Sequence, residues 1–232
     1  RRMSRRTPEE LAIIREYAWL HTELLPYLYS HVAACHEGGQ PLMRPLDAKY
    51  HYLLGKDILV APIFEDSNTR QVSLPEGQWR YWFDDTRLLE GGTTFARDYP
   101  LDEFPVYIRD GAILPMRIAR AYTGIGDRDW EGLLTLNLYP DGGEHTFQVR
   151  HPEGNGRATA TVVMQGKAPL TVRIEGAARP HLLRVLAPAK PKSVTRDGAP
   201  LAEGAAWRYT PETQRLTVRT DESVTGTYEV GF

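Results

Sequence analysis

Residues 134–138 read Leu-Thr-Leu-Asn-Leu, an alternation of apolar and polar side chains with a period of two. Because successive side chains of a β-strand point to opposite faces, this stretch predicts a strand with one apolar face and one wet face. Similar short segments occur on both sides of it, from about residue 41 to the C-terminus. The predicted strands are 57–63, 70–74, 78–83, 93–97, 105–108, 112–115, 133–139, 144–149, 157–164, 170–174, 181–187, 193–196, 215–219 and 225–230.

Glycine-containing turn sequences separate many of these segments. They are Pro75-Glu76-Gly77, Glu90-Gly91-Gly92, Asp110-Gly111, Asp141-Gly142-Gly143 and Asp197-Gly198. Many short strands without a helical pattern between them favour antiparallel β-sandwiches over a parallel sheet. Residues 117–131 are rich in arginine, glycine and aspartate and show no periodicity, so we place a domain boundary there.

The first forty residues predict helix instead. Thr7 and Glu10 form the sequence of a capping box, in which each side chain bonds the other residue's backbone amide. Pro26 removes a backbone donor and should kink or divide the helix near residues 21–23, and Gly38-Gly39 should end it. The apolar stripe is too wide for a lone surface helix, which predicts packing against a larger body. It contains Leu11, Ile13, Ile14, Tyr17, Ala18, Leu20, Leu24, Leu25 and Leu28.

Composition narrows the class of protein. The chain has 232 residues, of which 41% are hydrophobic and 25% charged, as in ordinary globular proteins. Its formal charge of -2 gives no reason to expect a nucleic-acid partner, and no apolar run reaches the ~20 residues of a membrane helix.

The single cysteine is informative about the cellular compartment, and the first residue about whether a segment lies upstream. Cys35 excludes an internal disulfide, which favours a reducing cytoplasm, although large secreted proteins can also lack disulfides, so the compartment stays open. The chain begins with Arg1 rather than methionine and has no signal-peptide pattern, from which we expect a segment upstream.

A search for catalytic and metal motifs finds none of the nucleophile-elbow, Walker, H-E-x-x-H or C-x-x-C patterns. Residues 127–132 imitate half of an EF-hand loop, but the twelfth position is Leu138 rather than glutamate. His31 and His36 fall on different helix faces, so they do not form a metal-binding pair. No sequence motif pairs Cys35 with a catalytic base. We therefore predict no metal and no cofactor.

Two carboxylate pairs, Asp84-Asp85 and Asp102-Glu103, are candidates for a glycosidase acid. Both stand in turn-like sequence, where acidic residues are common for structural reasons, so we assign no catalytic residue.

Aromatic residues are the remaining candidates for binding. In residues 78–83, alternation places Trp79, Tyr81 and Phe83 on one face, as expected of core, and Trp82 with Arg80 on the other. Aromatic faces stack on sugar rings, so Trp82 is a candidate sugar-binding residue, and Trp130 is a second one.

Several strings, read in order, resemble the C-terminal region of glycoside hydrolase family 31, which includes α-glucosidases, α-xylosidases and sulfoquinovosidases. Residues 24–30 resemble the last helix of that family's (β/α)8 barrel, and residues 41–46 (Pro-Leu-Met-Arg-Pro-Leu) resemble the entry to its proximal β-domain. The most specific strings are 52–63 (Tyr-Leu-Leu-Gly-Lys-Asp-Ile-Leu-Val-Ala-Pro-Ile), 74–79, 90–92 and 104–116. Residues 188–194 and Asp197-Gly198 resemble the distal β-sandwich more loosely.

The resemblance implies a mainly β fold: a helical remnant of the barrel at residues 1–40, a proximal β-sandwich at 41–116 and a distal β-sandwich at 117–232. It also implies a retaining α-glycosidase whose two catalytic carboxylates come from barrel loops upstream of these residues. The implied partners are that barrel and an α-linked oligosaccharide or glycoside, and this chain alone is expected to be inactive. Sugar specificity, transglycosylation or lyase chemistry, and homo-oligomer formation stay open.

Two departures from the family stand out. The stretch between the Arg-Pro-Leu and Tyr-Leu-Leu-Gly strings is short, only residues 47–51, and residues 149–154 replace a Tyr-Glu-Asp-Asp-Gly turn. Two alternatives of other classes also stay open: a β-sandwich that binds carbohydrate without cleaving it, on Trp82 and Trp130, and a purely structural or interaction module.

Overall fold

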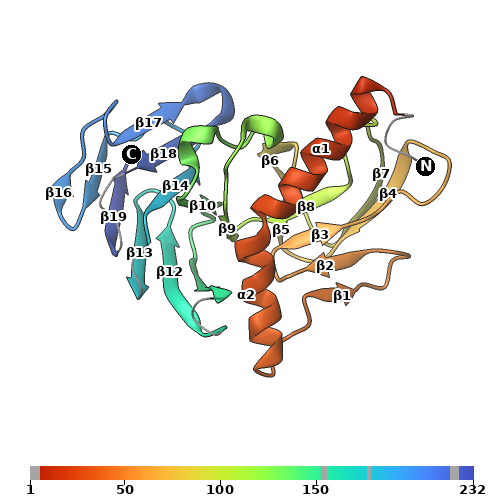
Figure 1. The fold of residues 1–232 in the computed structure, drawn as a ribbon, viewed down its shortest axis with the longest axis horizontal. Helices are drawn as coiled ribbons and strands as arrows, with labels where there is room; N and C mark the ends of the chain where they lie inside the picture. The colour runs from red at the N-terminus through yellow and green to blue at the C-terminus, as the bar shows by residue number, and fades with distance from the viewer. Residues whose placement is uncertain (1–5, 153–155, 177–178, 220–224) are drawn as a thin grey trace.

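The structure, a computed structural model, describes residues 6–152, 156–176, 179–219 and 225–232. Within these residues the chain is mainly β, with two helices at the N-terminus that cross the middle of the molecule between two groups of strands (Figure 1). The expected fold class, an N-terminal helical region followed by antiparallel sheets, is confirmed. None of the described helices is long and apolar enough to cross a membrane.

The two helices are α1 (Pro8–Glu23) and α2 (Leu25–His36). The predicted capping box is present: the Glu10 amide donates to Thr7 Oγ1 at 3.2 Å, and the Thr7 amide donates to Glu10 Oε2 at 2.9 Å. Pro26 lies in the first turn of α2, where its missing N–H is tolerated, so the predicted division of the helix is confirmed.

The first group of strands is a six-stranded sheet in the order β1-β2-β3-β8-β5-β6, covered on one side by the two-stranded β4-β7 ribbon. These strands are β1 (Met43–Pro45), β2 (Tyr52–Leu54), β3 (Ile58–Val60), β4 (Thr69–Leu74), β5 (Gln78–Tyr81), β6 (Asp84–Glu90), β7 (Thr93–Asp98) and β8 (Val106–Arg109).

Two further sheets form the second group. One has the order β17-β18-β14-β10-β9, and the other has the order β11-β12-β13-β19-β15-β16. The strands are β9 (Ile113–Met116), β10 (Leu134–Leu138), β11 (Glu144–Arg150), β12 (Ala158–Gly166), β13 (Leu170–Gly176), β14 (His181–Leu186), β15 (Ser193–Arg196), β16 (Ala199–Pro200), β17 (Trp207–Thr210), β18 (Arg215–Arg219) and β19 (Gly226–Gly231). The 3-10 turns η2 (Ala121–Thr123), η3 (Arg128–Trp130) and η5 (Pro211–Thr213) lie in the connections.

The strands differ from expectation in pairing and in extent, and β1, β2, β6, β16 and β17 have no counterpart among the predicted strands. β10 and β14 are parallel, so the second group is not purely antiparallel. The predicted turn at Asp84-Asp85 is wrong, because β5 ends at Tyr81, the chain turns at Trp82-Phe83, and Asp84 begins β6. The alternation rule missed β6 because its sequence, Asp-Asp-Thr-Arg-Leu-Leu-Glu, carries no period-two apolar pattern.

The buried residues form two clusters, and β3 contributes to both. Ile58 and Val60 face the larger cluster, which also contains Tyr27 of α2 and the inner faces of the second group of strands. Leu59 points the other way, into a cluster with Trp79 and Tyr107 beneath the β4-β7 ribbon. Trp79 and Tyr81 are therefore core residues, as predicted.

The strand β9 links the two groups. It follows β8 after a short turn at residues 110–112, yet it pairs with β10 and not with the first sheet. The chain therefore joins the second group of strands at residue 113, four residues before the domain boundary that the sequence predicts at 117. Whether residues 1–40, 41–116 and 117–232 are separate folding units stays a prediction.

Candidate functional site

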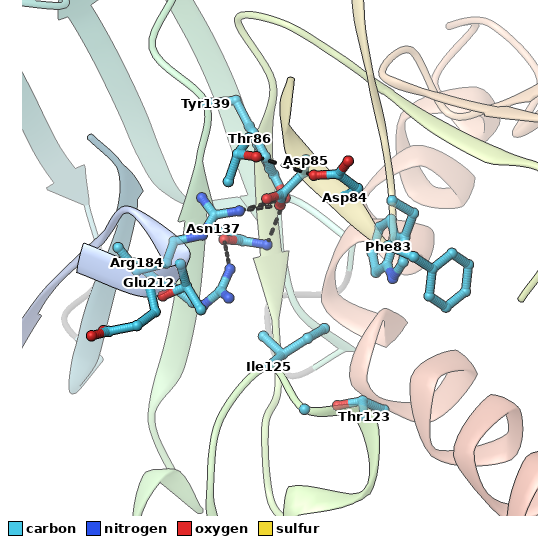
Figure 2. A pocket seen from close by; sticks show the side chains of 14 residues that line it. Phe83, Asp84, Asp85, Thr86, Thr123, Ile125, Asn137, Tyr139, Arg184 and Glu212 are labelled. Carbon is cyan, nitrogen blue, oxygen red and sulfur yellow. Dashed lines mark hydrogen bonds and ion pairs between the residues drawn. The ribbon is translucent and has the colours of Figure 1, made fainter. Parts of the chain in front are cut away.

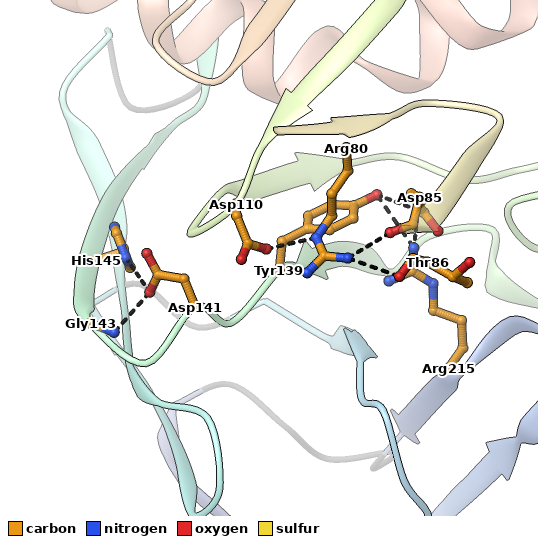
Figure 3. Close-up of polar contacts among 9 residues, drawn as sticks. All are labelled: Arg80, Asp85, Thr86, Asp110, Tyr139, Asp141, Gly143, His145 and Arg215. Atoms are coloured by element: carbon orange, nitrogen blue, oxygen red, sulfur yellow. Dashed lines mark hydrogen bonds and ion pairs between the residues drawn. The ribbon is translucent and has the colours of Figure 1, made fainter. Parts of the chain in front are cut away.

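A polar network joins the two groups of strands (Figure 3). Asp85 at the start of β6 forms an ion pair with Arg215 of β18 and accepts a hydrogen bond from Tyr139 Oη at 2.9 Å. On the other side of Tyr139, Arg80 of β5 donates to Asp110 Oδ1 at 2.7 Å. The side chain of Arg215 is almost fully buried, so its ion pair with Asp85 is a buried electrostatic link between the two groups of strands.

The network continues to Arg184. Arg184 Nη1 donates to Asn137 Oδ1 at 2.9 Å, and Asn137 Nδ2 donates to Tyr139 Oη at 3.2 Å. Asn137 and Arg184 are partners in the parallel register of β10 and β14. Burial and the nearby charge of Arg215 lower the pKa of Arg184 to about 10, so it stays a cation at neutral pH.

These residues line a groove of about 360 Å³ between β6, the 123–125 segment and η5, which we call the junction groove (Figure 2). Asp84, Asp85 and Thr86 lie on one side of it, and Arg184 and Glu212 on another. Its lining residues are Trp82, Phe83, Asp84, Asp85, Thr86, Thr123, Gly124, Ile125, Asn137, Tyr139, Arg184, Glu212, Thr213 and Arg215. The groove thus offers aromatic surface, acidic acceptors and guanidinium donors together.

The sequence missed the polar floor of this groove. The wet face predicted for residues 134–138 is wrong, because Thr135 and Asn137 are both buried. The β5-β6 turn and the 123–125 segment cover the part of that face at Asn137. An asparagine at mid-strand was the available signal, but its partner Arg184 lies 47 residues away in the sequence.

The two predicted sugar-binding tryptophans lie in different places. Trp82 is half-buried in the β5-β6 turn and lines the junction groove. Trp130 is also half-buried, but it lines a separate pocket beside β17 and packs against Gly126, where any Cβ would collide with its ring. The structure therefore does not bring them into one site, and a sugar-binding role for either stays a prediction.

The carboxylate pairs considered for catalysis have structural partners. Asp85 binds Arg215 and Tyr139, and Glu103 Oε2 accepts a hydrogen bond from Tyr81 Oη at 2.6 Å. The EF-hand-like segment is engaged as well: Asp129 pairs with Arg219 at 3.1 Å, and Glu131 pairs with Arg120 at 2.9 Å.

His31, His36 and Cys35 of α2 differ from one another in burial. His31 is enclosed beside Tyr27 and Phe147, and burial lowers its pKa to about 4. His36 is exposed, and Cys35 is half-buried rather than fully buried. Within the described ranges, no three His, Cys, Asp or Glu side chains come together as metal ligands.

A second polar cluster lies beneath α2, around Asp57. The Asp57 amide donates to Tyr27 Oη at 3.0 Å, and Tyr27 Oη donates to the Leu54 carbonyl at 3.0 Å. The Asp57 residue is only 5% exposed, and its Oδ2 has no hydrogen-bond partner among the described residues. Burial raises the pKa of Asp57 to about 6, against the opposing charges of Lys56 and Arg109.

The raised pKa predicts a pH dependence of stability. The folded chain holds the Asp57 proton more tightly than the unfolded chain, so this contribution to stability is full below about pH 4 and is lost as pH rises through 6. Asp57→Asn removes the effect. The free energy of unfolding of the variant, relative to the parent, should therefore rise by about 2 kcal/mol between pH 4 and pH 7 in urea titrations. The exposed Asp66→Asn serves as control, and a flat difference for Asp57→Asn contradicts the prediction.

The chain matches a known protein family model and resembles curated proteins in sequence. Residues 39–114 match the family model described as the glycosyl hydrolase family 31 C-terminal domain. The chain is 31% identical over 156 residues to alpha-glucosidase 2 of Bacillus thermoamyloliquefaciens, covering 61% of this chain and 19% of that protein. It is 29% identical over 207 residues to an isomaltosyltransferase of Sporosarcina globispora, covering 81% of this chain and 18% of that protein.

A solved structure agrees over nearly the whole chain. The cycloalternan-forming enzyme from Listeria monocytogenes, in complex with a pentasaccharide substrate, superposes with a TM-score of 0.85 at 23% identity. The match covers 97% of this chain and 24% of that one. The chain thus spans about a fifth of the length of the curated relatives it matches. Residues 39–114 thus carry the C-terminal domain of glycosyl hydrolase family 31, and the chain as a whole is similar to the C-terminal region of enzymes of that family.

Proposed function

We propose that this chain is the non-catalytic C-terminal part of a retaining α-glycosidase that hydrolyses O-glycosyl bonds of α-linked sugars. In this proposal the catalytic aspartates lie upstream, in a (β/α)8 barrel, and act as nucleophile and as acid then base. The relatives named above are an α-glucosidase and an isomaltosyltransferase, which supports chemistry on α-linked sugars. Hydrolysis and transfer share the same first step, so product analysis of the longer protein distinguishes them.

The observation that carries the proposal is an outward apolar face on the two helices. Leu11, Ile14, Leu25 and Val32 recur at helical spacing and are 37%, 38%, 46% and 50% exposed. The opposite face of α2 is well packed: Tyr27 and Leu28 are buried, and Ser30 Oγ accepts a hydrogen bond from the Arg150 amide at 2.9 Å. A helix pair that is apolar on both sides requires a second packing partner, and an upstream barrel supplies one.

Activity assays test the division of labour. The chain alone should not turn over aryl α-glycosides, because in this proposal both catalytic aspartates lie upstream in the barrel. The longer protein that includes the barrel should turn them over. Appreciable turnover by the chain alone would refute the proposal.

Stability measurements test the packing of the helices. Leu25→Lys should change the free energy of unfolding of this chain by no more than about 0.5 kcal/mol, because the side chain is exposed here. In the longer protein the same change buries a charge against the barrel and should destabilise by about 2 kcal/mol or more. Ala12→Lys, exposed on another face of α1, is the matched control. A neutral Leu25→Lys in both proteins would show that nothing covers this face.

A further inference from the structure

The junction groove is built like a binding site, although the ion pairs around it serve the fold. It lies where two separately paired groups of strands meet, a common location for ligand pockets. Its volume of about 360 Å³ falls at the lower end of the range for small-molecule sites. A ligand of one or two sugar units is of that size class.

The charges in the groove favour a neutral ligand. Arg215 is neutralised by Asp85, whereas Arg184 has the neutral amide of Asn137 as its hydrogen-bond partner and forms no ion pair within the described part of the chain. Asp84 and Glu212 are exposed at the rim. An anion that approached Arg184 would be repelled by the rim carboxylates, and a cation attracted to the rim would be repelled by Arg184.

A neutral polyhydroxyl ligand can bind the guanidinium of Arg184 and the rim carboxylates at the same time. Each hydroxyl group can accept from the guanidinium of Arg184 and donate to a carboxylate such as that of Glu212. Trp82 adds a half-buried indole to the lining, and aromatic rings pack well against the apolar C–H faces of sugars. Charged side chains of both signs beside one tryptophan therefore select for a carbohydrate.

We propose that the junction groove is a carbohydrate-binding site, in which Trp82 supplies the stacking surface, Arg184 the donors, and Asp84 and Glu212 the acceptors. The choice of α-linked glucose units as ligand rests on the proposed function of the longer protein. The mixed polarity of the groove requires only a neutral polyhydroxyl molecule.

Calorimetric titration of the chain with maltotriose and isomaltotriose tests the site. We expect saturable, weak binding of at least one of them. Trp82→Ala should raise the dissociation constant about tenfold, because it removes an aromatic contact of about 1.4 kcal/mol. Glu212→Gln should raise it several-fold without affecting the fold, since this side chain is exposed. The exposed Glu9→Gln on α1 is the matched control and should leave binding unchanged.

Three results would overturn the inference. The first is the absence of saturable binding in a chain that unfolds cooperatively. The second is binding that Trp82→Ala and Glu212→Gln both leave unchanged, which would place the sugar elsewhere. The third is competition by inorganic phosphate, which would identify an anion site. If the longer protein cleaves aryl α-glycosides while the groove binds no sugar, only this inference fails. If the groove binds sugar and the longer protein is inactive, only the proposed function fails.

Discussion

Asp85→Asn is expected to lower the free energy of unfolding by about 3 kcal/mol, because it leaves the buried guanidinium of Arg215 without its counter-ion. Arg215 is only 3% exposed, and its Nε and Nη1 already have no hydrogen-bond partner in the described structure. Asp85 is thus the carboxylate that holds this cation at the boundary between the two groups of strands. Urea denaturation followed by circular dichroism measures the loss.

The neighbouring residue offers a matched control. Asp84→Asn changes the same charge one position away, at an exposed side chain, and should stay within about 0.5 kcal/mol of the parent. Adding Arg215→Met to Asp85→Asn should recover part of the loss, because it removes the orphaned charge rather than restoring the pair. Equal stability of the Asp84 and Asp85 variants would show that the ion pair does not form.

Gly55→Ala is expected to destabilise the chain by about 3 kcal/mol, for two additive reasons. Gly55 has φ of +66°, a left-handed conformation that costs a residue with a Cβ about 1–2 kcal/mol. A Cβ there would also collide with Tyr27 Oη and lie 2.6 Å from His31 Nε2. Tyr27 is fully buried and hydrogen-bonded to the backbone on both sides of Gly55, so it cannot yield without breaking those bonds.

Gly124→Ala separates the two contributions. Gly124 has nearly the same φ, +68°, but an added Cβ there meets nothing within 4 Å. The Gly124→Ala variant should therefore lose only the conformational part of the free energy of unfolding, about 1–2 kcal/mol. The difference between the two variants in thermal or urea unfolding reports the collision beneath α2. Equal losses would mean that Tyr27 and His31 move aside freely.

The features that the sequence predicted are those set by neighbours along the chain. The capping box at Thr7 and the division of the helix at Pro26 depend on residues within one helical turn, so their patterns are local. The core positions of Trp79 and Tyr81 followed from strand alternation alone. The family resemblance also rested on contiguous strings, and the match to residues 39–114 spans those from 41–46 to most of 104–116.

The features that it missed depend on contacts between distant segments. Asp85 and Arg215 are separated by 130 residues, and no pattern near either one indicates the other. Thr135 and Asn137 alternate with leucines, a pattern that predicts an exposed polar face, yet both are buried. A polar side chain with a hydrogen-bond partner can be buried as well as exposed, so the pattern alone does not distinguish the two cases. Of the residues that line the junction groove, the sequence therefore indicated only Trp82, as an aromatic residue, and Asp84-Asp85, as a carboxylate pair.

The placement of β9 determines where hybrids of this β-domain region can be joined. Its four residues follow the first sheet in the sequence but hydrogen-bond to β10, and the Gly111 amide donates to the Tyr139 carbonyl at 2.7 Å just before it. A hybrid that exchanges the distal β-region between relatives at residue 117 would join a resident edge strand, β9, to a foreign sheet. A splice point ahead of Ile113, within the Asp110–Ala112 turn, would keep that strand with its own neighbours.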